Sequence, residues 1–285
     1  MEKALGRIEN LNLDNRTFQV VVGHQKRTFT LSRAQIKKYN IYLHDGLYVD
    51  FEYTLDATII DGVKSYPVVG FIKMMQNVDH EQHIYFNINK VKKDISKILN
   101  KKKNKLFIDL EFSMPAYDHK GHFLCEIVQY GFVVLDEDDT VIYEDASLVK
   151  PYYKYGISDR LIDFLHIDAK DFKDAKTYKE FYHSLKQVIE EYEPMIFVWG
   201  TNDITILDRF YKFYKLPALT TRASFINLMQ VIKNYYGLKN DIGLFNALSL
   251  FDDTFDEKQI HDALDDALVT GMVYHQFKMY TNELK

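Results

Sequence analysis

The sequence predicts an α/β domain, with a mixed sheet flanked by helices, preceded by a small all-β barrel. Segments in which apolar and polar residues alternate fill residues 1–78. A lysine-rich stretch follows, and residues 105–285 then show strand patterns first and alternating strand and helix patterns afterwards. At 285 residues the chain has the length for two domains of roughly 100–200 residues each. We therefore expect a barrel in residues 1–78, a linker in 79–104 and a second domain in 105–285.

The barrel is predicted from the order of its elements, which is three strands, a short helix and two strands. Ser32 is a suitable N-cap for the helix over residues 33–39, and the strand patterns occupy residues 4–11, 17–22, 27–31, 46–54 and 66–75. This is the order of an OB-fold barrel, and the succession of strands and turns resembles a cold-shock-like OB module. OB barrels bind single strands by stacking bases on exposed aromatic rings. Candidate stacking rings are Phe18, Phe29 and Tyr48. The alternatives are that these rings form the core and that the barrel docks a protein.

Residues 79–104 are predicted to be a basic linker, helical as far as Leu99 and a tether from 100 to 104. Lysines dominate this region and the start of the next strand, at Lys90, Lys92, Lys93, Lys97, Lys101, Lys102, Lys103 and Lys105. Residues 1–105 carry 18 Lys and Arg against 11 Asp and Glu, a net charge of +7, whereas residues 106–285 carry 18 against 30, a net charge of −12. A nucleic acid would therefore be attracted by the first part of the chain. The alternative is that these charges only solvate the surface.

The composition excludes several classes of protein. With 47% hydrophobic and 27% charged residues, the chain is typical of a soluble globular protein. Its single cysteine, Cys125, excludes an intramolecular disulfide and a cysteine-rich zinc site. The sequence offers no run of 18 apolar residues for a membrane span and no signal-peptide pattern at its start. We expect no membrane partner and a cytoplasmic location.

The second domain is predicted to begin with a buried strand that starts at Lys105 and includes Phe107 and Ile108. Further strand patterns lie at residues 126–135, 140–143 and 195–199, and helical patterns occupy residues 158–165, 177–192, 204–213, 225–236, 243–251 and 263–280. A group of strands followed by alternating strands and helices is typical of a mixed sheet with helices on its faces.

Two carboxylates, Asp109 and Glu111, end the first strand of this domain. Side chains alternate between the faces of a strand, so both carboxylates point the same way, about 7 Å apart. They repel each other unless a cation lies between them. Hard oxygen ligands of this kind suit Mg²⁺ or Mn²⁺. The alternative is a strand that runs into a polar loop.

More acidic residues lie downstream at positions where they can join this pair. Asp203 comes just after a buried strand, at the start of a helix, and His261 precedes the last helix. Asp262 and Asp266 share a face of that helix, while Asp265 points elsewhere. The helix also carries two small residues, Ala263 and Ala267, which allow it to pack close to the sheet. The alternative for these acids is that they complement the dipole of the helix N-terminus.

Together these residues resemble the DEDDh family of 3′-5′ exonucleases, which includes RNase T, oligoribonuclease and the proofreading subunits of DNA polymerases. The first motif, D-x-E, is Asp109-Leu110-Glu111. The second motif is Trp-Gly-Thr-Asn-Asp, ending at Asp203, and its form is most similar to the KapD-like branch. The third, H-x-A-x-x-D-A, is met at residues 261–267. The resemblance covers residues 105–280 and implies an RNase H-like fold for them.

The resemblance also implies a reaction, the hydrolysis of phosphodiester bonds with two divalent metal ions, Mg²⁺ or Mn²⁺. By resemblance, Asp109 bridges both ions, Glu111 and Asp266 complete one site, and Asp203 holds the other. His261 would take the proton from the attacking water.

Three residues beside the acidic pair are candidate substrate contacts. Leu110 and Phe112 flank the carboxylates and can pack against the terminal nucleotide, although either can also be core. Many relatives have Thr or Ser directly after the Glu, whereas this chain has Phe112 there and Ser113 next. We interpret this departure as a change in substrate contact and not in chemistry.

The sequence therefore predicts a metal-dependent 3′-5′ exonuclease that acts on single-stranded nucleic acid, with RNA favoured over DNA. The alternative from another class is a non-catalytic nucleic-acid-binding or regulatory protein that keeps the fold, and it predicts the loss of a metal ligand or of the base. The resemblance leaves a monomer and a homodimer open.

Overall fold

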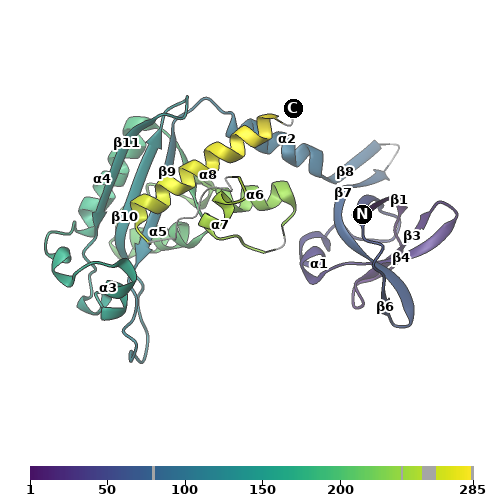
Figure 1. The fold of residues 1–285 in the computed structure, drawn as a ribbon, viewed down its shortest axis with the longest axis horizontal. Coiled ribbons are helices and arrows are strands. Elements are labelled where there is room, and N and C mark those ends of the chain that lie inside the picture. The colour runs from purple at the N-terminus through teal and green to yellow at the C-terminus, as the bar shows by residue number, and fades with distance from the viewer. Residues whose placement is uncertain (79–80, 239, 252–260, 284–285) are drawn as a thin grey trace. The chain divides into compact units, whose positions relative to one another are not determined.

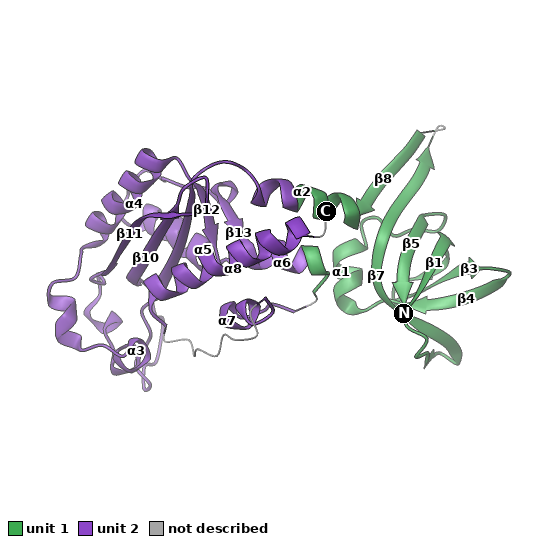
Figure 2. Ribbon diagram, turned by 45° about the horizontal axis from the view of Figure 1, so that its top comes forward, with its two compact units in different colours: residues 1–95, 235–239 green, residues 96–234, 240–285 purple. Residues whose placement is uncertain are grey.

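The computed structural model describes residues 1–78, 81–238, 240–251 and 261–283 (Figure 1). The chain forms two compact units, residues 1–95 with 235–239 and residues 96–234 with 240–285 (Figure 2). Among the described residues, no helix combines the length and the apolar character that crossing a membrane requires.

The first unit consists of a β-sheet, helix α1 (Arg33–Tyr39) and the greater part of the helix that follows the last strand. Its strands are β1 (Glu2–Arg7), β2 (Glu9–Asn12), β3 (Thr17–Val22), β4 (Gln25–Thr30), β5 (Tyr48–Tyr53), β6 (Thr58–Ile60), β7 (Val63–Val78) and β8 (Glu81–Asn87). They pair in the order β1-β5-β7-β4-β3-β2, with β6 and β8 also on β7. Strands β1 and β2 follow one another in the sequence, separated only by Ile8, yet they lie at the two ends of this strand order. The arrangement is consistent with an OB-like module.

A capping box explains where helix α1 begins, and the burial of the candidate stacking rings shows which of them can contact a base. Ser32 and Gln35 form a capping box at the start of α1, as the sequence predicts for Ser32. Phe18 and Phe29 are fully buried and pack on one another with their ring centroids 5.7 Å apart. Of the two alternatives for Phe18 and Phe29, the core is therefore confirmed, and neither ring can stack on bases. Tyr48 is 37% exposed.

The predicted linker differs from the structure in its first part. Residues 81–87 form strand β8, which pairs antiparallel with the end of β7. The helical part of the prediction corresponds to α2 (Ile88–Leu99). The sequence does not predict this strand because its three apolar residues, Ile84, Tyr85 and Phe86, are consecutive and do not alternate with polar ones, so that only the pairing with β7 defines it.

The second unit contains a five-stranded mixed sheet in the order β11-β10-β9-β12-β13. Its strands are β9 (Lys105–Phe112), β10 (Ile127–Leu135), β11 (Val141–Leu148), β12 (Met195–Val198) and β13 (Phe225–Asn227). Strand β10 is antiparallel to β9 and β11, whereas β12 is parallel to β9 and β13. The helices of this part of the chain are α3 (Asp159–Leu165), α4 (Tyr178–Tyr192), α5 (Asn202–Phe213), α6 (Leu228–Tyr236), α7 (Leu244–Leu248) and α8 (Ala263–Glu283). This is the predicted α/β class, an RNase H-like mixed sheet flanked by helices.

Some element boundaries differ from the predicted ones. Residues 225–227, predicted as helix, form β13, and the strand predicted at 140–143 extends to Leu148. The helix predicted at 243–251 is shorter in the structure, where α7 covers Leu244–Leu248 and residues 249–251 form a turn.

The two faces of β9 have different neighbours, and this positions the acidic pair. Leu106, Ile108 and Leu110 belong to the core that α4 and α5 complete on one face of the sheet. On the other face, Phe107 packs against Phe197 and against Tyr274 of α8. Because side chains alternate along a strand, Asp109 and Glu111 lie on the same face as Phe107, under α8 (Figure 1).

A buried charge cluster joins the start of β9 to α8. The fully buried ammonium group of Lys105 donates hydrogen bonds to the backbone carbonyls of Asp136 (2.8 Å) and Glu137 (3.2 Å) and to Oδ1 of Asp139 (2.6 Å). Lys278 of α8 also donates to the Asp139 carboxylate. Burial alone would raise the pKa of Asp139, but the hydrogen bonds from the two lysines outweigh it and hold that pKa below its ordinary value.

The variant Asp139→Asn is expected to lower the free energy of unfolding by about 3 kcal/mol, because it leaves the buried Lys105 ammonium without its counter-charge. Asn tolerates the left-handed backbone of residue 139, which has φ 66°. Urea denaturation at neutral pH measures the effect. The matched control is Asp138→Asn, whose ion pair with Lys102 is exposed and whose loss should leave the denaturation midpoint unchanged. Equal losses in both variants would contradict the prediction.

Candidate active site

One cavity of about 590 Å³ collects all five residues singled out by the motifs. Asp109 and Glu111 come from β9, Asp203 from the first turn of α5, and Asp266 from the first turn of α8, with His261 just before that helix. Ligand atoms of Glu111, His261 and Asp266 lie within 4.8 Å of one another. The structure thus brings together residues that are up to 157 positions apart in the chain.

Asp203 reaches the acidic pair because β12 ends early. The parallel pairing of β12 with β9 stops at Phe107, so the backbone of β9 beyond that point has no strand beside it on this edge. The N–H groups of Leu110 and of Asp203 itself hydrogen-bond the Asp203 carboxylate. This carboxylate also lies in the first turn of α5, where the helix dipole favours negative charge.

Asp262, in contrast, is the N-cap of α8. Its Oδ1 accepts hydrogen bonds from the backbone N–H groups of Leu264 (2.9 Å) and Asp265 (3.2 Å). Its Oδ2 accepts a 2.6 Å hydrogen bond from Gln129, and Gln129 in turn accepts one from the N–H of Ala263. Asp262 therefore stabilises the N-terminus of α8, which is the alternative given above for the acidic residues of this helix. Its hydrogen bond with Gln129 also holds the start of the helix against β10.

Gly131 lets α8 approach the sheet beside the acidic pair. It lies opposite Asp109 in the antiparallel pairing of β10 with β9. A Cβ atom at residue 131 would meet the carbonyl oxygen of Ala263 at 2.2 Å and the nitrogen of Leu264 at 2.4 Å. Only glycine allows so close an approach, and Ala263 and Ala267 are fully buried at the same interface, as their size predicted.

His261 is held by a contact that no motif indicates. Its backbone is left-handed, with φ 57°, and its imidazole stacks on the ring of Phe164 of α3 with centroids 4.2 Å apart. Phe164 also lines the cavity. Nothing in the sequence distinguishes this phenylalanine from other apolar residues of a short helix, so sequence analysis missed it.

The carboxylates of the cavity are buried together, and this raises their pKa values. Burial and the neighbouring charges of Asp266 and Asp203 raise the pKa of Glu111 to about 8. Burial also raises the pKa of Asp203 to about 7 and that of Asp109 well above its ordinary value, with the nearby carboxylates adding to the effect on Asp109. Such a set of hard oxygen donors fits divalent cations, which would relieve the repulsion.

These shifts predict that the metal-free chain loses stability as the pH rises. The folded chain keeps protons on Glu111 and Asp203 up to pH 7–8, whereas the unfolded chain releases them near pH 4, so unfolding is favoured between these values. In EDTA we expect the free energy of unfolding to fall by about 1 kcal/mol or more between pH 5 and 8. Urea denaturation at several pH values measures this, and Glu111→Gln should flatten the slope. A rise in stability over this window would contradict the prediction.

The candidate substrate contacts lie in different places. Phe112 and Leu110 line the cavity, although Leu110 is also part of the core under α4 and α5. Ser113 is buried, does not line the cavity, and its hydroxyl oxygen accepts a 2.8 Å hydrogen bond from the N–H of Glu126. Its position therefore speaks against the expected substrate contact, because its hydroxyl is used to hold the loop after β9.

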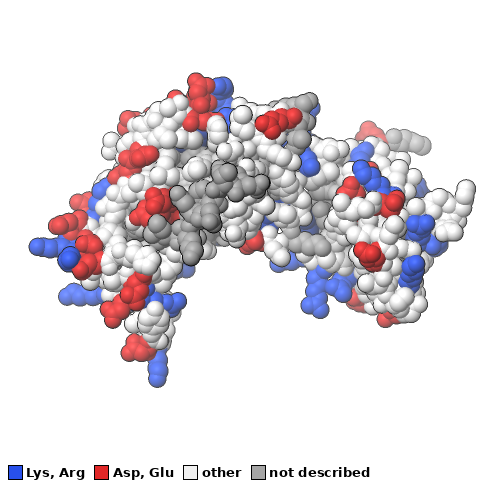
Figure 3. Space-filling model, in the orientation of Figure 1, with Lys and Arg blue, Asp and Glu red and all other residues white. Residues whose placement is uncertain are grey.

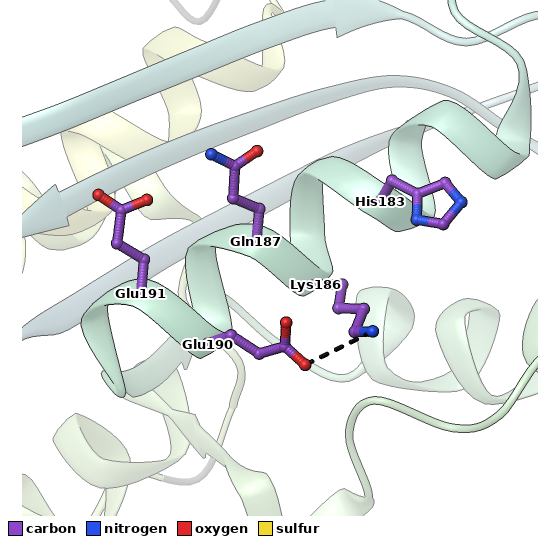
Figure 4. A pocket seen from close by; sticks show the side chains of 5 residues that line it. All are labelled: His183, Lys186, Gln187, Glu190 and Glu191. Atoms are coloured by element: carbon purple, nitrogen blue, oxygen red, sulfur yellow. Dashed lines mark ion pairs between the residues drawn. The ribbon is translucent and has the colours of Figure 1, made fainter.

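A second hollow lies on the outer face of α4. It is lined by His183, Lys186, Gln187, Glu190 and Glu191, all from that one helix (Figure 4). The side chains of Lys186 and Glu190 form an ion pair at 3.6 Å. This hollow is a solvated helix surface and shows no convergence of side chains from different elements.

Comparison with known proteins agrees with this geometry. Residues 106–274 match the sequence profile of the exonuclease family of RNase T. The probable 3′-5′ exonuclease KapD of Bacillus subtilis (strain 168) is 29% identical over 175 residues, which cover 61% of this chain and 82% of the relative.

Two solved structures show the same fold. The nuclease domain of 3′hExo, a DEDDh family member bound to rAMP, aligns with a TM-score of 0.55 at 16% identity, over 62% of this chain and 93% of that chain. Cell-death related nuclease 4 (CRN-4) aligns with a TM-score of 0.51 at 19% identity, over 64% of each chain. The predicted resemblance to exonucleases is confirmed, and because the family profile covers more than half of its length, the chain belongs to the RNase T family of exonucleases.

Proposed function

We propose that this exonuclease is metal-dependent and removes nucleotides one at a time from the 3′ end of single-stranded nucleic acid, with RNA favoured over DNA. The observation that carries the proposal is the convergence of Asp109, Glu111, Asp203, Asp266 and His261 in one cavity. The 3′ direction is supported by the similarity to KapD, a probable 3′-5′ exonuclease. RNA is favoured because two proteins of the same fold recognise RNA components: the 3′hExo nuclease domain binds rAMP, and a 3′-exonuclease recognises a histone mRNA stem-loop.

The four buried carboxylates would hold the metal ions. Two divalent ions, Mg²⁺ or Mn²⁺, would stabilise the attacking and leaving oxygens of the phosphodiester when bound. Asp109 lines the same cavity as the other three carboxylates, and its charge interacts with those of Asp203, Asp266 and Glu111, which fits a residue that would serve both ions. Glu111 and Asp266 would complete one site and Asp203 the other.

His261 would accept the proton of the attacking water. Histidine is the side chain suited to accept a proton near neutral pH. Its imidazole lies at the cavity within 4.8 Å of ligand atoms of Glu111 and Asp266, and the stack on Phe164 fixes the orientation of the ring. Phe112 and Leu110 would pack against the terminal nucleotide.

The first unit would hold the substrate strand through its basic and aromatic side chains. Arg27 and Lys64 lie over the ring of Tyr66, at 5.8 and 5.4 Å from its centroid, and Tyr48 is partly exposed. Replacing Arg27 and Lys64 with alanine should lower RNA affinity and flatten its salt dependence. Unchanged RNA binding would favour a protein as the partner of this unit.

A time course with labelled single strands tests the proposed reaction. With Mg²⁺ or Mn²⁺, a 5′-labelled RNA should give a ladder that shortens by one nucleotide at a time, and a 3′-labelled RNA should release labelled mononucleotide from the start. EDTA should stop both. A matched DNA strand measures the sugar preference. Intact RNA and DNA would instead support a non-catalytic nucleic-acid-binding protein.

A further inference from the structure

Exposed aromatic rings gather on two segments of the second unit, residues 113–125 after β9 and residues 150–158 before α3. Tyr117 is 79% exposed and Tyr155 44%. The rings of Tyr153 and Tyr155 are stacked with centroids 5.0 Å apart, and the half-buried Phe123 lies 5.6 Å from both Tyr155 and His119. A contiguous group of exposed aromatic rings is typical of an interaction surface.

This aromatic surface is continuous with the cavity of the acidic residues. The segment 113–125 begins directly after Phe112, and both Phe112 and Met114 line the cavity. Helix α3 makes a second connection, because Phe164 stacks on His261 and Arg160, one turn earlier on the same face, lies over the ring of Tyr117 at 5.8 Å. Figure 1 shows α3 and the start of α8 at the same end of the sheet.

The two segments are fixed to one another by buried polar groups. The carboxylate of Glu126, which is almost fully buried, accepts hydrogen bonds from the N–H groups of Tyr152 (2.7 Å) and Tyr153 (3.0 Å). Ser158 donates a 2.8 Å hydrogen bond to the carbonyl of Met114. The rings are thus held in place before any partner binds, which lowers the entropic cost of binding.

The local charge favours a polyanion as the partner. The two segments, residues 113–125 and 150–158, together carry three Lys against one Asp, whereas residues 106–285 have a net charge of −12. On the face drawn in Figure 3, acidic side chains are spread over the second unit with basic ones among them. A surface with exposed rings, a cation–π pair and a local positive charge suits unpaired bases and their phosphates.

We propose that Tyr117, Phe123 and Tyr155 form a stacking platform for the bases of the substrate strand that lie 5′ of the terminal nucleotide. This inference rests on the proposed function, in which the 3′-terminal nucleotide occupies the cavity. The strand leaving the cavity would pass the Arg160–Tyr117 pair and stack on the remaining rings. The platform would make the enzyme prefer strands of several nucleotides over a dinucleotide.

The test compares kcat/KM for a single-stranded 20-mer RNA with kcat/KM for a dinucleotide, in wild type and in the double variant Tyr117→Ala/Tyr155→Ala. We expect the ratio of the two values to fall by about 10- to 100-fold, because stacking contributes about 1–3 kcal/mol per base. The variant Tyr117→Phe/Tyr155→Phe keeps the rings and should restore the ratio. Equal losses on both substrates, or no loss, would overturn the inference while leaving the nuclease activity established.

A matched control and a binding measurement separate the remaining outcomes. Tyr152 is 64% exposed in the same segment; its ring packs edge-on against Tyr153, at 4.9 Å, and against Phe213, the last residue of α5, about 15 Å along that helix from Asp203, and it is not one of the three proposed platform rings. The variant Tyr152→Ala should therefore keep the wild-type ratio. Fluorescence anisotropy of the labelled 20-mer in EDTA tests the platform even if wild type cleaves neither substrate. Affinity equal to wild type in the double variant would exclude the platform and point to a protein partner for these rings.

Discussion

The variant Asp109→Asn is expected to lose nuclease activity by about 1000-fold or more in kcat/KM, and to be more stable than wild type without metal. The activity falls because Asp109 is the carboxylate proposed to serve both ions, so its loss weakens both proposed ion sites. The stability rises because burial and the charges of Asp203, Asp266 and Glu111 disfavour the ionised form of Asp109. We expect a gain of about 1 kcal/mol at pH 8 in EDTA.

Two measurements on the same protein preparation check this pair of effects. Cleavage of a 5′-labelled RNA gives kcat/KM, and thermal unfolding in EDTA and in Mn²⁺ gives the stability. Wild type should gain stability on addition of Mn²⁺ and the variant much less, because a bound ligand stabilises the state that binds it. An Asp109→Asn protein that is inactive and also less stable in EDTA would show that Asp109 has a structural role. It would contradict the prediction that repulsion among the carboxylates destabilises the metal-free protein.

Local patterns were sufficient for the parts of the site that depend on one element. The alternation along β9 predicts that Asp109 and Glu111 share a face, and the structure places both under α8. The order of elements predicts an α/β domain, and Ser32 predicts the start of α1. In each case the information lies within one strand or one turn of helix.

The parts that sequence analysis missed depend on contacts between distant residues. Strand β13 has three residues, and it is a strand because it pairs with β12. Alternation in β3 and β4 predicts two faces but does not say which one is inside, so the sequence leaves both stacking and core open for Phe18 and Phe29, and the structure places both in the core. Phe164 acquires its role only when α3 meets the residue before α8.

Gly131 is the clearest example of a residue whose role depends on a contact that the sequence does not show. The sequence shows only a glycine inside a strand, yet the backbone of Ala263, 132 positions away, occupies the space of its missing side chain. The close approach sets the distance between α8, which carries Asp266, and β9, which carries Asp109. A residue with no reactive group thereby determines how the reactive groups are spaced.

The variant Gly131→Ala is therefore expected to reduce both activity and stability. Its Cβ would lie 2.2–2.4 Å from backbone atoms of Ala263 and Leu264, so the start of α8 must move away from the sheet. Overpacking of this kind costs about 1–3 kcal/mol. A displacement of about 1 Å between Asp266 and the β9 carboxylates is expected to lower kcat/KM by about 100-fold.

Gly271→Ala is the matched control at the same interface. A Cβ atom at residue 271 would make ordinary contact with the ring of Phe107, at 3.6 Å, and alanine is favoured over glycine inside a helix by about 0.5–1 kcal/mol. We expect this variant to be at least as stable as wild type and as active. Urea denaturation measures the stability of both variants, and cleavage of RNA measures their activity. If Gly131→Ala kept wild-type activity, the spacing of α8 from β9 would not control the reaction, and the approach of Ala263 to Gly131 would be a feature of packing alone.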